Sequence, residues 1–99
     1  MRYLGVFASL IMFSFPVFSA DMTKDERCEK LGEVTAQASV MRIAGKDTET
    51  ATSALLEIYD QPGSGLSTKQ IRAYTNWAYM MRMEPEKARK YAVDQCKQS

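Results

Sequence analysis

The chain has 99 residues, with 13 basic and 12 acidic side chains, two cysteines and no histidine. Without histidine, acid–base catalysis near neutral pH would need a strongly perturbed carboxylate, lysine or cysteine, and most zinc sites are excluded. The near-neutral charge balance argues against nucleic-acid binding, for which a basic excess is usual. We therefore expect a protein that is not an enzyme, carries no cofactor and binds no nucleic acid.

Residues 1–20 have the three-part composition of a secretory signal peptide. Arg2 is their only charged side chain, an apolar run extends from Leu4 to Phe15, and the small residues Ser19 and Ala20 follow. The run is shorter than the roughly 20 apolar residues that a membrane-spanning helix needs. We predict export to the periplasm or the medium, with cleavage after Ser19 or Ala20. The membrane is then involved only before cleavage, and a retained membrane anchor is the alternative.

Export changes the expected state of the two cysteines, Cys28 and Cys96. An oxidising compartment favours their pairing, and two cysteines allow one intramolecular bridge. Closing a loop of about 68 residues is worth roughly 4 kcal/mol in the chain-entropy model, a large share of the stability of a small domain. An intermolecular bridge and two free thiols are the alternatives.

The first helix of the remaining domain, residues 21–99, is predicted over residues 24–44. Thr23 and Glu26 have the spacing of a capping box at its start. Apolar or small residues then recur at helical spacing, and Gly45 is suited to a left-handed C-terminal cap. A stripe of apolar residues therefore faces a core along this helix.

Two further helices are predicted by the same signals. Asp47 or Thr48 caps the second, which stops at the loop-like residues 60–65. Ser67 and Gln70 form a second capping box that opens the third helix. No segment alternates β-branched and polar residues, so we expect no strands.

Pro85 decides the topology of the last part of the chain. The residue before a proline is disfavoured in a helix, so the third helix should end near Met83 or Glu84. Proline is favoured at the first position of a new helix. If Cys28 pairs with Cys96, the chain must turn sharply here, because one straight helix would place Cys96 at the far end. We predict an all-α fold, a small up-and-down bundle of about four short helices.

Charge is unevenly distributed along the domain. Residues 21–60 hold nine acidic and five basic side chains, whereas residues 61–99 hold three acidic and seven basic ones. We expect the two halves to pack together with weak attraction between their rims. A dimer, or a partner with a charged face, is the alternative explanation.

Aromatic and methionine side chains are densest in the third helix. Trp77 shares a helical face with Tyr74, whereas Tyr79, Met80 and Met83 spread onto other faces. Tyrosine, tryptophan and methionine are enriched in interface cores, so we predict that Tyr79, Met80 and Met83 form an exposed apolar patch that binds a partner. Trp77 and Arg42 are further candidates for contact with that partner. The alternative is that a small bundle surrounds the helix on several sides and buries them.

Two charged features and one metal hypothesis complete the candidates. Arg42, in the apolar end of the first helix, either extends to solvent or anchors a carboxylate or a helix C-terminus. The basic run at residues 87–90 is interpreted as a solvated face with pairs within the helix. Thioethers select Cu(I), so Met80 and Met83 near Trp77 could serve a soft-metal or small-ligand carrier. Without histidine or a methionine repeat we assign no metal site.

The succession of Cys28, Met41-Arg42-x-x-Gly45, Ala78-Tyr79 and Cys96 resembles a loose pattern in small exported proteins of Gram-negative bacteria. Those proteins are helical by prediction and carry one cysteine near each end of the mature chain. The resemblance brings no catalytic residue with it. In size, export and single bridge the chain is also similar to periplasmic immunity proteins and acid-stress chaperones.

These observations together predict an exported, non-catalytic interaction protein, such as an inhibitor, an immunity factor or an envelope-stress accessory. Its partner is expected to be another protein of the cell envelope, and a homodimer is possible. A soft-metal or small-ligand carrier and a structural envelope protein are the competing hypotheses.

Overall fold

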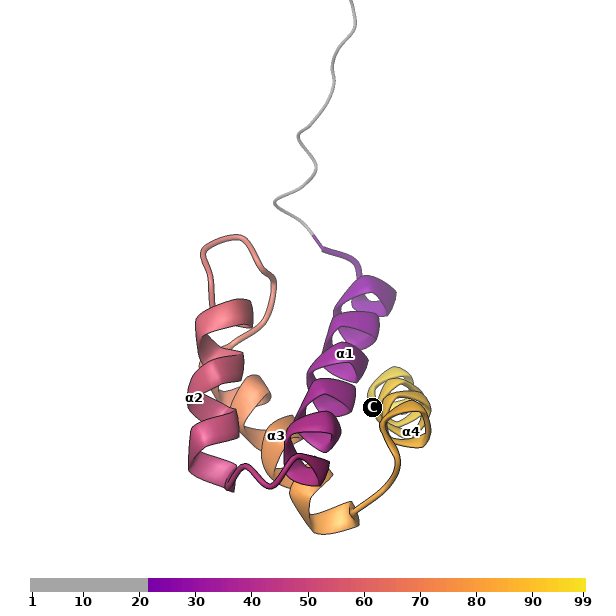
Figure 1. Cartoon of the computed structure of the whole chain (residues 1–99). Helices are drawn as coiled ribbons and strands as arrows, with labels where there is room; N and C mark the ends of the chain where they lie inside the picture. The colour runs from indigo at the N-terminus through magenta and orange to yellow at the C-terminus, as the bar shows by residue number, and fades with distance from the viewer. Residues whose placement is uncertain (1–21) are drawn as a thin grey trace, which may run out of the picture.

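Four helices make up the part of the chain that the structure describes. The computed structural model describes residues 22–99, and the predicted signal peptide lies outside them. In chain order the helices are α1 (Lys24–Ile43), α2 (Thr48–Tyr59), α3 (Thr68–Met81) and α4 (Pro85–Gln98) (Figure 1). No strand occurs in this range, and the predicted all-α fold is confirmed.

The predicted starts of the first three helices are confirmed by capping hydrogen bonds at their N-termini. Thr23 and Glu26 form a reciprocal capping box, in which each side chain accepts from the other residue's backbone N–H. Ser67 and Gln70 form the second one. Asp47 caps α2 by accepting from a backbone N–H. These bonds satisfy donors that the first turn of a helix would otherwise leave unpaired.

The third helix ends earlier than predicted. Its last residue is Met81, because Arg82 adopts the left-handed conformation at φ 55° and so terminates the helix. Met83 and Glu84 then form a short connection, and Pro85 begins α4 at a position where its missing N–H costs nothing. The predicted turn at Pro85 is confirmed.

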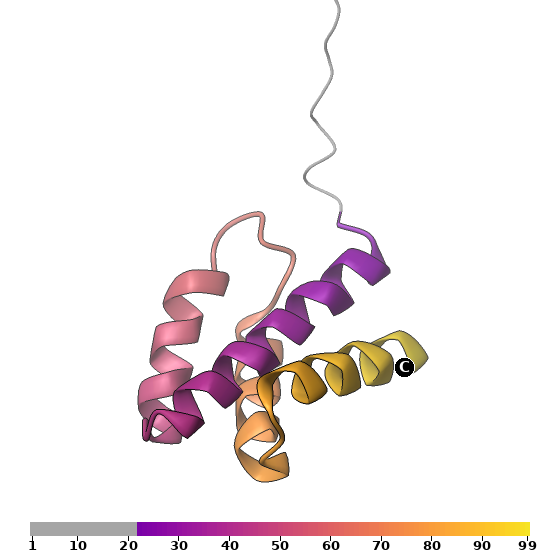
Figure 2. The ribbon, with the colours of Figure 1, turned by 45° about the vertical axis from the view of Figure 1, so that its right-hand side comes forward.

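Helix α1 is the centre of the fold. It packs most extensively against α4 and also contacts α2 and α3, whereas α3 and α4 meet each other little. Figure 2 shows α4 running beside α1 while it diverges from α3. The core of buried apolar side chains lies mainly between the first three helices, and it consists of Leu31, Val34, Ala38, Leu55, Leu66, Ile71 and Ala78.

The predicted disulfide joins the start of α1 to the end of α4. Cys28 is fully buried, its Cα lies 5.4 Å from that of Cys96, and the two sulfur atoms are bonded. The bridge forms because α4 runs back along α1 after the turn at Pro85. Helix α4 is thereby fixed against α1 at the end remote from that turn.

Close packing at Gly32 supports the same contact. A Cβ atom at this position would lie 2.5 Å from Cγ2 of Val93 on α4. Only a residue without a side chain therefore allows the two helix backbones to approach this closely.

One ion pair joins the acidic and basic halves within residues 22–99. Nζ of Lys97 on α4 lies 3.5 Å from Oε2 of Glu29 on α1. The other two pairs are internal to single helices, Lys30 with Glu33 and Arg89 with Glu86. The two halves pack together as expected, but most of their opposite charges are not paired directly.

Candidate functional site

A stack of aromatic rings bridges α3 and α4. The rings of Trp77 and Tyr91 are stacked, with centroids 4.9 Å apart and planes inclined by 25°. Tyr74, one turn before Trp77 on α3, meets the tryptophan edge-on at 5.9 Å. Both arrangements are favoured geometries for aromatic pairs. The stack is the main side-chain link between two helices that otherwise share few contacts.

An open hollow lies on one side of this stack. Its volume is about 440 Å³, and Tyr74, Trp77 and Met80 supply its apolar lining from α3. Gln95 and Ser99, at the end of α4, supply polar groups. Met80 is 71% exposed, the largest exposed fraction among the large hydrophobic side chains of the described residues. We call this feature the apolar hollow.

A second hollow lies at the α3–α4 connection. It has a volume of about 570 Å³, and Tyr91 and Met83 contribute its apolar lining. Its other lining residues are all charged. Because Tyr91 lines this hollow while its stacking partner Trp77 lines the first, the ring stack stands between the two. We call the second feature the charged hollow; its charged residues are Arg82, Glu84, Lys87, Lys90 and Asp94.

Tyr79 does not belong to this surface. Its side chain is half-buried, packs against the core, and donates a hydrogen bond of 2.6 Å to the carbonyl oxygen of Lys46. Burial raises the pKa of Tyr79, and the nearby charge of Asp47 adds to the effect, while Arg42 opposes it. The expectation that Tyr79 is exposed beside Met80 is therefore corrected.

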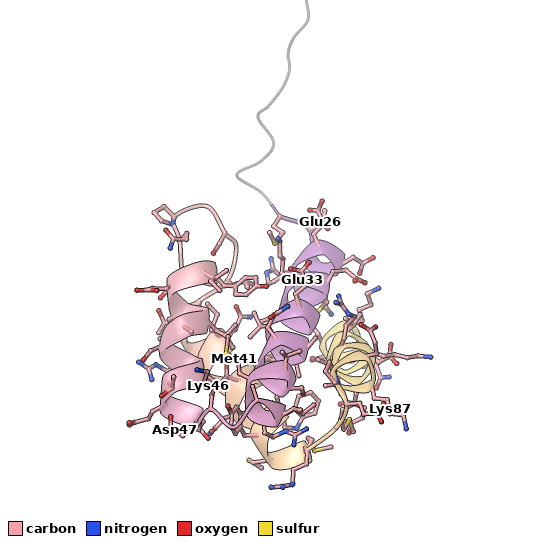
Figure 3. The ribbon with its side chains drawn as sticks, viewed as in Figure 1. Glu26, Glu33, Met41, Lys46, Asp47 and Lys87 are labelled. Atoms are coloured by element: carbon pink, nitrogen blue, oxygen red, sulfur yellow. A yellow bond between two sulfur atoms is a disulfide. The ribbon has the colours of Figure 1, made fainter. Side chains whose placement is uncertain are left out.

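The reason for this correction is the position of the α1–α2 connection. Figure 3 labels Lys46 and Asp47 where the chain leaves α1 and enters α2. Tyr79 faces this connection, whereas Met80, the next residue on the helix, is turned by about 100°. Tyr79 therefore stabilises the fold, whereas the side chain of Met80 is exposed and accessible to a partner.

Arg42 and Met83 are brought together by the fold. Nη2 of Arg42 donates a hydrogen bond of 2.8 Å to the backbone carbonyl of Met83. Both side chains are half-buried. Arg42 therefore does not simply extend to solvent: it binds a backbone carbonyl just beyond the C-terminal end of α3. This bond positions the connection that borders the charged hollow.

The structure separates the two methionines of the soft-metal hypothesis. Met80 lines the apolar hollow together with Trp77, whereas Met83 lines the charged hollow. Within residues 22–99, no group of three or more cysteine, aspartate or glutamate side chains is placed to hold a metal ion. We therefore find no specific observation that favours the carrier hypothesis.

Sequence reasoning missed several residues of the α3–α4 surface. Tyr91 on α4 is one of them: it is 37% exposed and forms half of the ring stack. Lys87 and Lys90 were interpreted as a solvated face paired within the helix. Only their neighbour Arg89 forms such a pair, with Glu86 at 3.6 Å. The spacing of residues on α4 could not indicate this surface, because the direction of α3 decides which face of α4 lies beside it.

Comparisons with family models, with curated proteins and with solved structures found no match to this chain. Among the helices at residues 22–99, none is both long and apolar enough to cross a bilayer.

Proposed function

We propose that this protein is an exported, non-catalytic binding protein whose partner is another protein of the cell envelope. The observation that carries the proposal is the apolar hollow, because aromatic rings and a freely exposed methionine line it on the surface. Side chains of these kinds are enriched where proteins meet, and methionine adapts to irregular partner surfaces. Inhibitors, immunity factors and envelope-stress accessories are the classes of binding protein that this description fits.

The disulfide supports the compartment in this proposal. Structural disulfides persist in the periplasm and outside the cell and are rare in reducing compartments. An intact mass measurement of the protein isolated from the cell envelope tests export directly. We expect a chain that begins after Ser19 or Ala20, with a mass two hydrogens lower than that of the reduced form. A product that retains Met1 and reduced cysteines would contradict the proposed compartment.

Photo-crosslinking in the native cell tests the binding surface. A photoreactive residue at position 80 should give one discrete adduct with an envelope protein. The same residue at position 57 on α2, on the other side of α1 from α4, should give none (Figure 1). The proposal fails if position 80 yields no adduct, or if both positions give the same mixture.

A matched pair of substitutions then tests affinity for the crosslinked protein. Met80→Asp and Ile58→Asp each place a carboxylate on an exposed apolar position, because the two side chains are 71% and 58% exposed. If Met80 contacts the partner near the centre of the interface, its substitution weakens binding by about tenfold or more. Ile58→Asp should leave the affinity unchanged. Equal effects of the two substitutions would remove the α3–α4 surface from the proposal.

A further inference from the structure

The charged hollow beside the ring stack is lined by more cations than anions. Arg82, Lys87 and Lys90 face it, against Glu84 and Asp94. None of these five side chains forms an ion pair within residues 22–99. Figure 3 shows Lys87 on the outer side of α4, away from the other helices. The cations of this hollow are therefore available to a charged ligand.

The C-terminal half of the domain, which contains α3 and α4, also carries a net positive charge. Residues 61–99 hold seven basic and three acidic side chains. Arg89 forms an ion pair with Glu86, and Lys97 forms one with Glu29. Five basic and two acidic side chains of residues 61–99 are left without an ion pair. This half of the molecule thus attracts negative charge, and such attraction contributes both encounter rate and selectivity.

Arg82 provides an independent indication. It is the only non-glycine residue among 22–99 with a positive φ, 55°, at the end of α3. Glycine or asparagine is usual where a helix ends in the left-handed conformation, because other side chains are strained there. Residues held in sparsely populated backbone conformations cluster at functional sites, so Arg82 is a candidate for direct contact with a ligand.

We infer that the α3–α4 surface recognises an acidic segment of its partner. One apolar side chain of the segment enters the apolar hollow, beside Trp77 and Met80. Neighbouring carboxylates meet the cations of the charged hollow, where the guanidinium of Arg82 can bind a carboxylate through two N–H groups. The inference rests on the proposed function and specifies the chemistry of the partner at the same surface.

Selection from a displayed library of random short peptides tests this chemistry on the disulfide-bonded protein. The bound peptides should be enriched in aspartate or glutamate within a few residues of a leucine, isoleucine or aromatic residue. Their binding should change the fluorescence of Trp77, the single tryptophan of the chain. It should also weaken as salt is added, since the contacts are partly electrostatic.

Substitutions at the charged hollow provide the decisive comparison. Arg82→Gly should weaken the binding of a selected peptide by about tenfold or more, because the charge-assisted hydrogen bonds of the guanidinium to a carboxylate are lost. The melting temperature of the Arg82→Gly variant should equal or exceed that of the parent protein, because glycine adopts the left-handed conformation without strain. A residue that is purely structural would not lose binding while stability is kept. Lys69→Gln, exposed on α3 and lining neither hollow, is the control, and it should lower the affinity far less than Arg82→Gly does.

Four outcomes would overturn the inference. The first is a selection that yields no peptides, or peptides without acidic enrichment. The second is peptide binding that Arg82→Gly leaves unchanged. The third is binding to phosphatidylglycerol vesicles in place of peptides, which would assign the cations to a lipid surface. The fourth is self-association that Ile58→Asp abolishes. Exposed Ile58 lies near Glu57 and Asp60 in the sequence, so this result would mean that a second copy of the chain supplies the acidic segment.

Failure of the inference and failure of the proposed function give different results. A discrete adduct from position 80 with a partner segment that is neutral or basic overturns the inference alone. Absence of both the adduct and selected peptides overturns the two together.

Discussion

The guanidinium of Arg42 on α1 holds the backbone carbonyl of Met83 at 2.8 Å, across 41 residues of sequence. Met83 lies in the connection between α3 and α4, so this bond attaches the border of the charged hollow to the central helix. The Nε atom of Arg42 is buried without a hydrogen-bond partner among the described residues. The arginine therefore positions the connection through one of its nitrogen atoms.

Arg42→Met should destabilise the protein by about 1–3 kcal/mol, since a part-buried carbonyl loses its bond to a charged donor. Methionine keeps an apolar stem in the same space, which separates the lost bond from lost packing. Urea unfolding followed by circular dichroism measures the change. Lys69→Met, at an exposed position of α3, is the control and should stay within about 0.5 kcal/mol of the parent. Equal stability of the two variants would mean that the bond contributes nothing.

Removal of the bridge with Cys28→Ala and Cys96→Ala together should lower the free energy of unfolding by about 2–5 kcal/mol. The bridge spans 68 residues, so its loss frees most of the described chain in the unfolded state. Chemical denaturation measures the effect, and the parent protein unfolded in the presence of reductant should match the double variant. A double variant as stable as the oxidised parent would contradict the prediction.

Gly32→Ala should destabilise the protein despite the better helix propensity of alanine. The gain from propensity is at most about 1 kcal/mol. Against it, the new Cβ would lie 2.5 Å from Cγ2 of Val93 and 3.3 Å from the backbone oxygen of Arg89. A β-branched side chain and a backbone atom yield poorly, so we expect a net loss of about 1–3 kcal/mol.

Thermal unfolding of Gly32→Ala checks the sign of this change. Ser53→Ala, at an exposed position of α2, adds alanine without a close neighbour helix and should be neutral or slightly stabilising. A stabilised Gly32→Ala would show that α1 and α4 can separate at no cost.

Asp47 should contribute a pH-dependent part of the stability. Its hydrogen bonds with Thr50, the backbone N–H first, hold the pKa of its carboxyl below the ordinary value. A carboxyl whose pKa is lower in the folded state stabilises the protein above its unfolded pKa, and this stabilisation is lost as pH falls through the folded pKa. The loss should therefore occur below about pH 4.

Asp47→Asn provides the comparison for this pH dependence. Asparagine also caps helices, so the variant should remain close to the parent near neutral pH. Below about pH 4 the parent should lose stability more steeply than the variant, as measured by denaturation at a series of pH values. Parallel pH profiles would contradict the role assigned to Asp47.

Features that depend on neighbouring residues could be predicted from the sequence. The capping boxes at Thr23 and Ser67 are local patterns with a defined hydrogen-bond geometry. Pro85 restricts the residue before it whatever the tertiary context. Two cysteines allow a single intramolecular pairing, so the bridge required no choice among connectivities.

Features that depend on the direction of a distant helix could not be predicted. Tyr79 and Tyr91 are both tyrosines within helices, yet the first donates a hydrogen bond to the α1–α2 connection and the second forms half of the ring stack. The role of Tyr79 depends on the position of the α1–α2 connection, and that of Tyr91 on the direction of α4, which follows α1 and diverges from α3. The left-handed backbone conformation of Arg82 could not be predicted either, since arginine has no particular preference for it.

Because the bridge joins residues 68 positions apart, it forms only in a chain that extends from Cys28 through Cys96. Because Cys28 lies near the start of α1 and Cys96 near the end of α4, every chain interrupted between them retains a solitary sulfhydryl group. Such a fragment can be captured by thiol–disulfide exchange, whereas a chain that contains both cysteines presents neither thiol once the bridge has formed. The same covalent bond that stabilises the fold can thus distinguish finished molecules from fragments during quality control.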